Sequence, residues 1–237
     1  RRYVHLATGN YHAGTSRLYT DYSYFTSDRD IGEDVHKLFQ RIATMSKQAK
    51  LKKIEHAPFT LHPKILSLIE REASNAKKGK PAAIHAKMNA LTEPEVIKAL
   101  YRASIVGVKI ELIVRGICCL SPGVKGVSDN IRVRSIVGRF LEHTRVFCFE
   151  NGGAREVYLS SADWMDRNFF TRVEILFPLL DQDLKERVFA ETIENYLKDN
   201  SESWMLLKNG RYNQRKSKKN SYSAQSKLIE SVQVSGF

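Results

Sequence analysis

The spacing of apolar residues divides the chain into a short first segment and a longer α/β region. Residues 1–30 alternate as two strands around a small polar turn, and helical spacing of apolar residues follows at 34–42. From residue 57 to residue 114, β-branched runs alternate with segments of helical period, and a proline opens each of the two helices. The expected order of strand, helix, strand, helix and strand occupies 59–61, 63–77, 82–88, 94–106 and 108–114.

Beyond a loop rich in Gly, Pro and Ser at 116–130, strands dominate the pattern until an amphipathic helix at 183–197. Helices between some strands and hairpins between others predict a mixed sheet, and Gly152-Gly153 predicts one of the hairpins. The expected strands occupy 131–137, 145–149, 156–159 and 172–177. The fold class is therefore predicted as α/β, with a mixed-sheet lobe that has helices on both faces.

The same pattern predicts three parts along the chain. Residues 1–56 are expected to be the last portion of a preceding, similar lobe, residues 57–200 a complete lobe, and residues 201–237 a basic tail. The polar run at 211–219 supports the tail because consecutive charges favour a solvated, flexible segment. The first residues have no signal-peptide pattern and resemble the middle of a strand, so the chain is expected to begin inside a longer one.

Composition narrows the class of partner. Hydrophobic residues make up 42% and charged residues 27% of the 237 residues, which is typical of a globular protein, and no apolar run is long enough to span a bilayer. The three cysteines form neither a CxxC pair nor a disulfide framework, as expected in a reducing cytoplasm. The net charge of +12 predicts a polyanionic partner, which could be nucleic acid, an acidic lipid surface or a phosphate chain.

One strand edge carries residues suited to phosphoryl transfer. His143 and Arg145, followed by Glu150, form an HxR(x)4E pattern, and residues two apart in a strand share a face. A histidine can attack phosphorus or give a proton to a bridging oxygen, and an arginine fork matches phosphate oxygens. On this triplet alone, the favoured interpretation is a half-exposed strand histidine beside a surface arginine.

A second pattern strengthens the first. The turn Ser160-Ser161-Ala162-Asp163 begins seventeen residues after His143, and it resembles the turn Thr8-Gly9-Asn10. Small residues at a strand end let backbone N–H groups approach an anion. An HxK/R motif followed by such a turn resembles the half-site of the phospholipase D superfamily, in which two lobes each supply one histidine. The HxK of the first lobe is then expected before residue 1.

Other candidates have plain structural alternatives. His85 and Lys87 also form an HxK triplet, but the triplet follows its turn and lacks an acidic residue at the (x)4 position, so His85 is predicted to be structural and Lys87 the functional member. Arg115 closes a strand, where α/β lobes bind ligands. Tyr19 can stack on a base or donate its hydroxyl to phosphate, although packing is the default for a strand aromatic.

Together these residues and their surroundings resemble the first family of polyphosphate kinases. The similar segments run in family order across residues 1 to about 200, and only the tail and the basic connection at 47–53 carry no family signature. They are Thr8-Gly9-Asn10-Tyr11, Thr15-Ser16-Arg17-Leu18-Tyr19-Thr20-Asp21, Leu112–Cys118, Val127–Arg132, Arg139–His143, Phe149–Gly153 and Tyr158–Met165. This resemblance implies two phospholipase D-like lobes, of which the first is present only in its last portion.

The resemblance also implies an activity and a site. The activity is reversible transfer of the terminal phosphate of ATP to inorganic polyphosphate through a phosphohistidine upstream of this chain, with Mg²⁺ bound by residues that also lie upstream. Tyr19, Arg115 and His143 are expected to contact nucleotide or phosphate, and His143 is expected to assist catalysis. Further phosphate contacts are expected from Asn10, Arg17, Arg145 and Arg172, with Arg167 a weaker candidate.

The expected partners are ATP, ADP and polyphosphate, in a cytoplasmic homo-oligomer with at most peripheral attachment to the inner membrane and no specific nucleic acid. The fragment alone is expected to be inactive. Two alternatives remain open. A phospholipase D-like phosphodiesterase or phosphatidyltransferase would carry Asp at the position of Glu150, and a non-enzymatic polyanion-binding protein would explain the charge alone.

Overall fold

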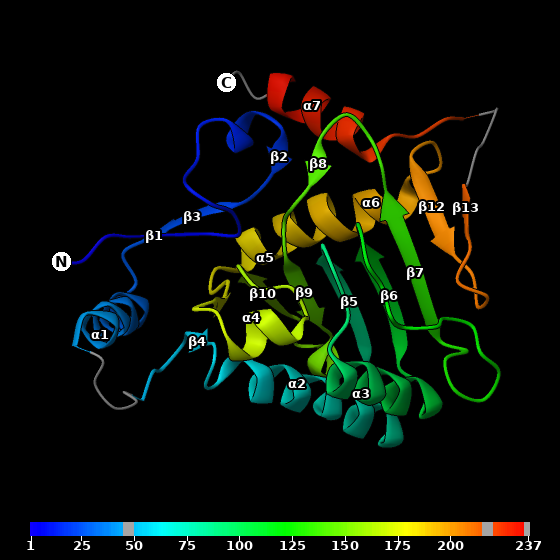
Figure 1. The fold of residues 1–237 in the computed structure, drawn as a ribbon, viewed down its shortest axis with the longest axis horizontal. Helices are drawn as coiled ribbons and strands as arrows, with labels where there is room; N and C mark the ends of the chain where they lie inside the picture. Colours follow the sequence, from blue (N-terminus) through cyan, green and yellow to red (C-terminus); the bar gives the residue numbers. More distant parts are fainter. Residues whose placement is uncertain (45–49, 215–219, 235–237) are drawn as a thin grey trace.

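A nine-stranded mixed sheet forms the centre of the computed structural model, which describes residues 1–44, 50–214 and 220–234 (Figure 1). Strands β5, β6 and β7 run parallel, and the other neighbours in the sheet pair antiparallel. In sheet order the strands are β13 (Tyr212–Gln214), β12 (Ser203–Leu206), β7 (Ile131–Ile136), β6 (Lys109–Val114), β5 (Ala83–Met88), β9 (Val146–Phe149), β10 (Glu156–Ser160), β11 (Ile175–Pro178) and β4 (Glu55–His56).

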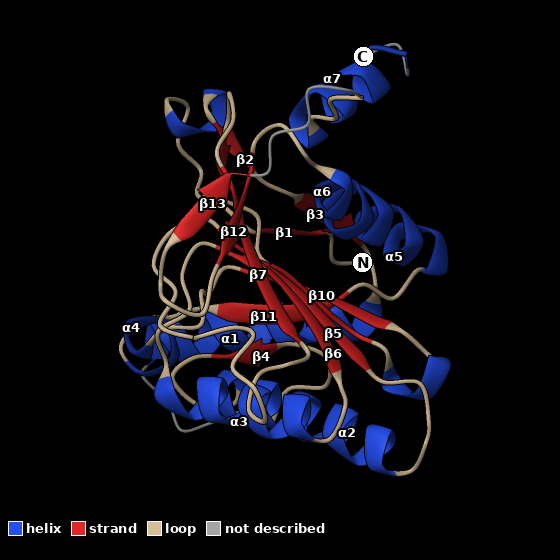
Figure 2. Ribbon diagram, turned by 90° about the vertical axis from the view of Figure 1, so that its right-hand side faces the viewer, coloured by secondary structure: helices blue, strands red, loops and turns tan. Residues whose placement is uncertain are grey.

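Helices cover both faces of this sheet, which confirms the predicted fold class (Figure 2). One face carries α2 (Leu61–Lys77) and α3 (Pro94–Ile105), and the other carries α5 (Gln182–Phe189), the π-helical turn η3 (Ala190–Glu194) and α6 (Asn195–Lys198). Residues of β5 alternate between the faces, as the period of a strand requires. Ile84, Ala86 and Met88 therefore face α2 and α3, while His85 and Lys87 face the opposite helices.

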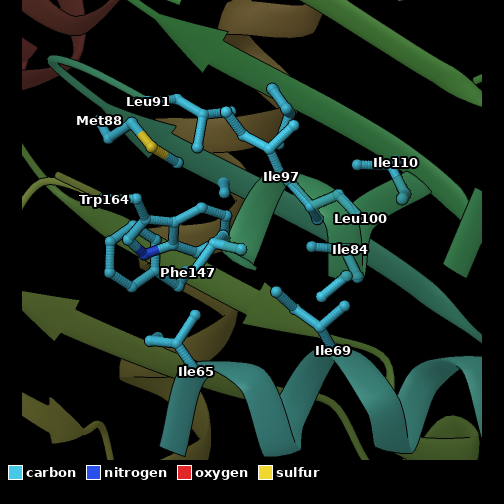
Figure 3. Close-up of a cluster of buried hydrophobic side chains, with 14 of the residues drawn as sticks. Ile65, Ile69, Ile84, Met88, Leu91, Ile97, Leu100, Ile110, Phe147 and Trp164 are labelled. Carbon is cyan, nitrogen blue, oxygen red and sulfur yellow. The ribbon is translucent and has the colours of Figure 1, made fainter. Parts of the chain in front are cut away.

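The core beneath α2 and α3 is built from aliphatic residues at helical spacing. Ile65 and Ile69 of α2 are fully buried, and Figure 3 shows them packed with Ile84, Phe147 and Trp164. The rings of Phe147 and Trp164 lie 4.8 Å apart between centroids, a separation that favours aromatic contact. Burial of such a stripe supplies most of the stability of an amphipathic helix.

The sequence placed most of these elements correctly, and the start of α3 shows why. Pro94 occupies the first turn, where its missing N–H costs nothing, and the carboxylate of Glu93 accepts the Val96 N–H at 2.6 Å. The hairpin at Gly152-Gly153 is also present, as the short helix η2 (Asn151–Gly153), with both glycines at positive φ. The helix α4 (Asp166–Phe170) falls between two predicted strands.

One predicted strand is wrong, and another is only partly present. At 59–61 the chain makes a turn in which the N–H groups of Phe59 and Thr60 both donate to the His56 carbonyl, and α2 begins at Leu61. The second strand predicted within residues 1–30 is expected at 16–24, where a 3-10 helix, η1 (Thr15–Arg17), precedes two short strands, β2 (Tyr19–Thr20) and β3 (Ser23–Thr26). In both places local hydrogen bonds satisfy backbone groups that the alternation alone assigned to a sheet.

The first segment forms its own two-stranded sheet and one helix. Strand β1 (Val4–Ala7) pairs antiparallel with β3, and α1 (Arg29–Thr44) follows. The buried carboxylate of Asp34 on α1 accepts the N–H groups of Lys52, Lys53 and Ile54 at 2.6–3.0 Å, which fixes the far side of the 45–49 connection. The predicted boundary near residue 56 falls at β4, which joins the main sheet.

The same segment is joined to the main lobe by a second short pairing. Strand β2 pairs in parallel with β8 (Leu141–Glu142), which lies in the long connection between β7 and β9 (Figure 1). Its register places Tyr19 opposite Leu141 and Thr20 opposite Glu142. The residues that follow each strand, Asp21 and His143, are thereby brought together.

The expected tail is wrong for most of its described residues. Strand β12 pairs with β7 and extends the sheet, β13 pairs with β12, and α7 (Ala224–Val234) packs with Ala224 and Gln225 buried. Apolar residues such as Trp204 and Leu206, which alternate along β12, explain why this segment folds. Of the basic run at 211–219, residues 215–219 lie outside the part of the chain that the structure describes.

His85 supplies a test of this packing. Its ring meets Phe189 edge-on at 5.3 Å, and burial, assisted by the Arg155 guanidinium and opposed by Glu150, lowers the pKa of His85 to about 4. Because the unfolded chain binds this proton near pH 6.5 and the folded chain does not, stability falls as pH drops from 6.5 to 4, by about 3 kcal/mol for this group.

We therefore expect His85→Leu to remove that component, so that its free energy of unfolding depends less on pH between 6.5 and 4 than that of the parent protein. Urea denaturation at pH 7, 5.5 and 4.5 measures the difference. His36→Leu, an exposed histidine on α1, is the matched control and should keep the parental pH dependence. Identical pH dependence in His85→Leu and the parent would contradict the assignment.

Candidate active site

A cavity of about 420 Å³ opens at one edge of the central sheet. Asn89 and Arg115, which line it, directly follow the last residues of β5 and β6. Arg145 precedes β9, Ser161 follows β10 and Glu174 precedes β11, and the antiparallel pairing brings these ends to the same edge. The carboxyl ends of parallel strands are where ligands bind in open α/β sheets.

His143 enters this cavity from β8 and is held by a carboxylate from the first segment. Its Nδ1 lies 2.9 Å from Asp21 Oδ2, and the side chain is 13% exposed. Asp21 also accepts a hydrogen bond from Thr8 Oγ1 at 2.7 Å. A carboxylate at Nδ1 fixes the ring orientation and leaves Nε2 as the nitrogen that can exchange a proton with a ligand.

Gly9 makes room for this carboxylate. A Cβ atom at position 9 would lie 2.1 Å from Asp21 Oδ2 and 2.3 Å from its Cγ, closer than any real contact. The glycine in Thr8-Gly9-Asn10 therefore has a steric role in addition to the backbone role that the sequence suggested. Asn10, the next residue, is exposed and lines the cavity.

Arg145 is a buried, fully engaged cation. Its Nη2 lies 2.9 Å from Asp163 Oδ2, its Nη1 donates to the Thr8 carbonyl at 2.9 Å, and Nη1 lies 3.1 Å from His143 Nε2. Asp163 in turn accepts the Asn89 N–H at 2.6 Å. Arg145 thus ties the first segment to the main lobe and sets positive charge beside His143.

The other arginines of the cavity are arranged differently. Arg115 is half-buried, Arg167 and Arg172 are exposed, and all three line the cavity. Among the residues that the structure describes, none accepts a hydrogen bond or ion pair from their guanidinium groups. Glu174, which also lines the cavity, accepts hydrogen bonds from Ser161 and Asn168 and not from these arginines. Three cations without a direct counter-charge repel one another, so this cluster favours an anionic ligand.

The structure thus assembles most of the predicted site. Asn10, Arg115, His143, Arg145, Arg172 and the weaker candidate Arg167 line one cavity. The Tyr19 ring lies 4.9 Å from the His143 ring, next to the cavity. Arg17, in contrast, is an exposed residue of η1 and is absent from the cavity lining.

Two further candidates lie elsewhere. Glu150 is at the opposite end of β9 and pairs with Arg155 at 3.1 Å, so the acidic member of the HxR(x)4E pattern is remote from the cavity. Lys87 is 3% exposed and pairs with the buried carboxylate of Glu142. Its predicted functional role is therefore not direct ligand contact. His85, predicted to be structural, packs in the core beside Phe189.

The Glu142 carboxylate has an unusual environment for a charged group. Burial acts to raise its pKa, but the Lys87 ammonium and hydrogen bonds from Gln225 and Tyr196 outweigh burial, and the pKa lies below its ordinary value. The Tyr196 phenol, buried beside this carboxylate, has its pKa raised. Glu142 is therefore a permanent anion inside the lobe, directly before His143.

Sequence reasoning missed Asp21, Asn89 and Glu142. Each lies next to a residue or strand end that the patterns had singled out, but its partners are distant in sequence. Asp21 and His143 are 122 residues apart, and Asn89 and Asp163 are 74 apart. Among the described residues, no group of three or more His, Cys, Asp or Glu could hold a metal ion.

The close approach at Gly9 gives a prediction about stability. We expect Gly9→Ala to displace the Asp21 carboxylate and to weaken its contacts with Thr8 and His143, lowering the free energy of unfolding by about 1–3 kcal/mol. Urea denaturation measures the change. Gly14→Ala, in the same loop, is the control because its Cβ would meet only the exposed His12 ring, and it should change stability by less than about 0.5 kcal/mol. Equal effects of both substitutions would contradict the steric role.

Comparisons with known proteins agree with this geometry. A family model described as polyphosphate kinase C-terminal domain 1 matches residues 1–48, and one described as polyphosphate kinase C-terminal domain 2 matches residues 54–225. The polyphosphate kinase of Paraburkholderia phytofirmans is 55% identical over 229 residues, which is 97% of this chain and 33% of that protein. The polyphosphate kinase of Pseudomonas aeruginosa is 57% identical over 212 residues, 90% of this chain and 31% of that protein.

The crystal structure of a polyphosphate kinase from Porphyromonas gingivalis superposes on the fold with a TM-score of 0.92 at 38% identity, and the match covers 98% of this chain and 36% of that one. The chain therefore spans about a third of the length of these relatives. Within the described residues, no helix is long and apolar enough to cross a membrane. The chain belongs to the polyphosphate kinase family, and its residues match that family's C-terminal domains 1 and 2.

Proposed function

We propose that this chain forms the receiving wall of a polyphosphate kinase active site, in an enzyme that reversibly transfers the terminal phosphate of ATP to inorganic polyphosphate. The proposal is based on the cavity in which His143, in contact with Asp21, lies together with four arginines. Transfer of a phosphoryl group passes through a metaphosphate-like transition state, which needs positioned positive charge more than covalent help.

In this proposal the arginines have two roles. Arg145, neutralised by Asp163, holds the shape of the cavity wall and the position of the His143 ring. Arg115, Arg167 and Arg172 are free to bind the oxygens of a phosphate chain, and their positive charge would stabilise the charge that develops during transfer. Tyr19 and Arg115, beside His143, are proposed nucleotide contacts.

His143 is proposed to assist the transfer and not to carry the phosphoryl group. With Nδ1 directed at Asp21, its Nε2 can give a proton to the bridging oxygen when the ring is charged, which makes ADP a better leaving group. The phosphohistidine is proposed to form on a residue outside this chain. Magnesium, which would neutralise charge on the phosphates of ATP, is likewise proposed to have its ligands outside this chain.

The remaining features of the proposal follow the family. A homo-oligomeric, cytoplasmic enzyme with at most peripheral attachment to the inner membrane is proposed, with no specific nucleic acid partner. The full set of substrates and the activity of the whole enzyme belong to this proposal because the chain is about a third of its relatives' length.

His143→Ala in the full-length enzyme tests the role of this histidine. We expect synthesis of polyphosphate from γ-³²P-labelled ATP, measured as acid-insoluble polymer, to fall by about 100-fold or more, as removal of a proton-transfer group does. His36→Ala, an exposed histidine on α1, should retain parental activity. Parental turnover in His143→Ala would overturn the assignment. Hydrolysis of a phosphodiester, with no labelled polymer from the parent enzyme, would support the phospholipase D-like alternative.

Arg115→Ala tests the anion-binding wall. Loss of one charge-assisted contact of about 1.5–3 kcal/mol predicts at least a tenfold increase in KM for ATP, because the cation binds the phosphates before and during transfer. Steady-state kinetics measure it. Arg102→Ala, on the outer surface of α3, is the matched control and should leave KM unchanged. An unchanged KM in Arg115→Ala would contradict a nucleotide contact at this position.

A further inference from the structure

Helix α7 reaches the segment around β8, the strand that directly precedes His143. The side-chain amide of Gln225, which is 3% exposed, pairs with the backbone of Phe140 in both directions: the Phe140 N–H donates to Oε1 and Nε2 donates to the Phe140 carbonyl, each at 2.9 Å. These are the two hydrogen bonds that a neighbouring strand would make. Gln225 thus takes the place of a neighbouring strand at Phe140, the residue before β8. Strand β2 pairs with β8 itself (Figure 1).

Gln225 also belongs to the group of donors around Glu142. Gln225 Nε2 donates to Oε1 at 2.5 Å, and the Tyr196 hydroxyl donates to the same oxygen at 2.8 Å. On the other oxygen, Oε2, the ammonium of Lys87 lies at 2.5 Å and the hydroxyl of Thr20 at 3.0 Å. Because a buried charge is costly unless it is paired and hydrogen-bonded, these four donors hold Glu142 in one position.

The position of Glu142 determines the position of the next residue, His143. Thr20 and Glu142 are opposite each other in the β2–β8 register, and the next residues, Asp21 and His143, lie in contact, with His143 Nδ1 2.9 Å from Asp21 Oδ2. The Thr20 hydroxyl donates to Glu142 and accepts the His143 N–H at 3.1 Å. A shift of β8 therefore changes the separation of the catalytic pair directly.

The fit between α7 and the connection before β8 is close. A Cβ at Gly138 would lie 2.6 Å from Gln225 Oε1 and 2.7 Å from Glu202 Oε2, so only glycine permits the observed placement of the amide. The start of α7 is fixed independently, because the Ala224 N–H donates at 2.8 Å to Asp199, a carboxylate with no exposed surface. Gln225 is thus anchored by its helix while it holds β8.

We propose that Gln225 of α7 is a positioning residue for His143, acting through Phe140 and Glu142 of the β8 segment. For its effect on turnover the inference rests on the proposed function, whereas its effect on the geometry of the His143–Asp21 pair does not. It gives a catalytic consequence to a part of the chain that the sequence predicted to be a tail.

The test uses two variants of the full-length enzyme. Gln225→Met keeps the length and helix propensity of the side chain but removes both amide groups. Gly138→Ala keeps the amide and displaces it. Both are expected to lower kcat for polyphosphate synthesis by about 10- to 100-fold, the scale on which a small misplacement of a reacting group acts. Lys227→Ala, an exposed residue of α7, is the control and should retain the parental kcat.

Two further measurements separate positioning from loss of stability. In a double-mutant cycle with Asp21→Asn, the effect of Gln225→Met on kcat should be much smaller than in the parent enzyme, because the pair through which it acts is already broken. In the crystal structure of Gln225→Met enzyme, His143 Nδ1 and the Asp21 carboxylate should lie beyond hydrogen-bond distance. Assays are run at a temperature at which circular dichroism shows each variant folded.

The outcomes are distinct. Parental kcat in both variants, multiplicative effects with Asp21→Asn, or an unchanged His143–Asp21 distance would each overturn the inference and leave the proposed function intact. Absence of polyphosphate synthesis in the parent enzyme would instead contradict the proposed function, and the crystal structure of Gln225→Met would then decide the inference alone.

Discussion

The Glu142 carboxylate is 3% exposed, and the candidate site depends on how this charge is neutralised. An ion moved out of water loses several kcal/mol of solvation, which only a close counter-charge and further hydrogen bonds offset. Lys87 from β5, Tyr196 from α6, Gln225 from α7 and Thr20 from β2 supply them. Removal of any one would leave polar groups buried without a partner. The need to satisfy one anion thus brings four elements to the strand that directly precedes His143.

The arginines that line the cavity differ in whether a carboxylate neutralises them. Asp163 neutralises Arg145, and that pair joins the first segment to the main lobe through the Thr8 carbonyl. Arg115, Arg167 and Arg172 have no such partners among the described residues, so their mutual repulsion remains. A protein keeps this arrangement where a ligand supplies the missing negative charge. The paired arginine, Arg145, therefore has a structural role in the lining of the cavity, whereas the three unpaired arginines are proposed to bind phosphate.

Local patterns in the sequence predicted most of the longer helices, most strands and several site residues, but neither α4 nor α7. Period and capping residues define α2 and α3, and the HxR spacing and the strand end at Arg115 each carry a local signal. The partners that make these residues a site have none. Asp21 meets His143 across 122 residues and Gln225 meets Glu142 across 83, and only the pairing of short strands and the packing of α7 bring them together. The tail was misjudged because its polar run outweighed the short alternation at β12.

The two histidines show how environment selects between identical side chains in similar patterns. His85 and His143 each begin an HxK or HxR triplet at a strand of the same sheet. His85 is packed against Phe189 with the Arg155 guanidinium nearby, and its pKa falls to about 4, so it stays neutral and half-buried at neutral pH. His143 instead has a carboxylate at Nδ1 and lines the cavity, where Arg145 Nη1 lies 3.1 Å from its Nε2. An imidazole exchanges protons usefully only where one nitrogen is oriented and the other is accessible. Of the two histidines, only His143 has a carboxylate that orients its ring and a position in the cavity. Neither feature is visible in the HxK or HxR triplet, so the motif alone could not distinguish the functional histidine from the structural one.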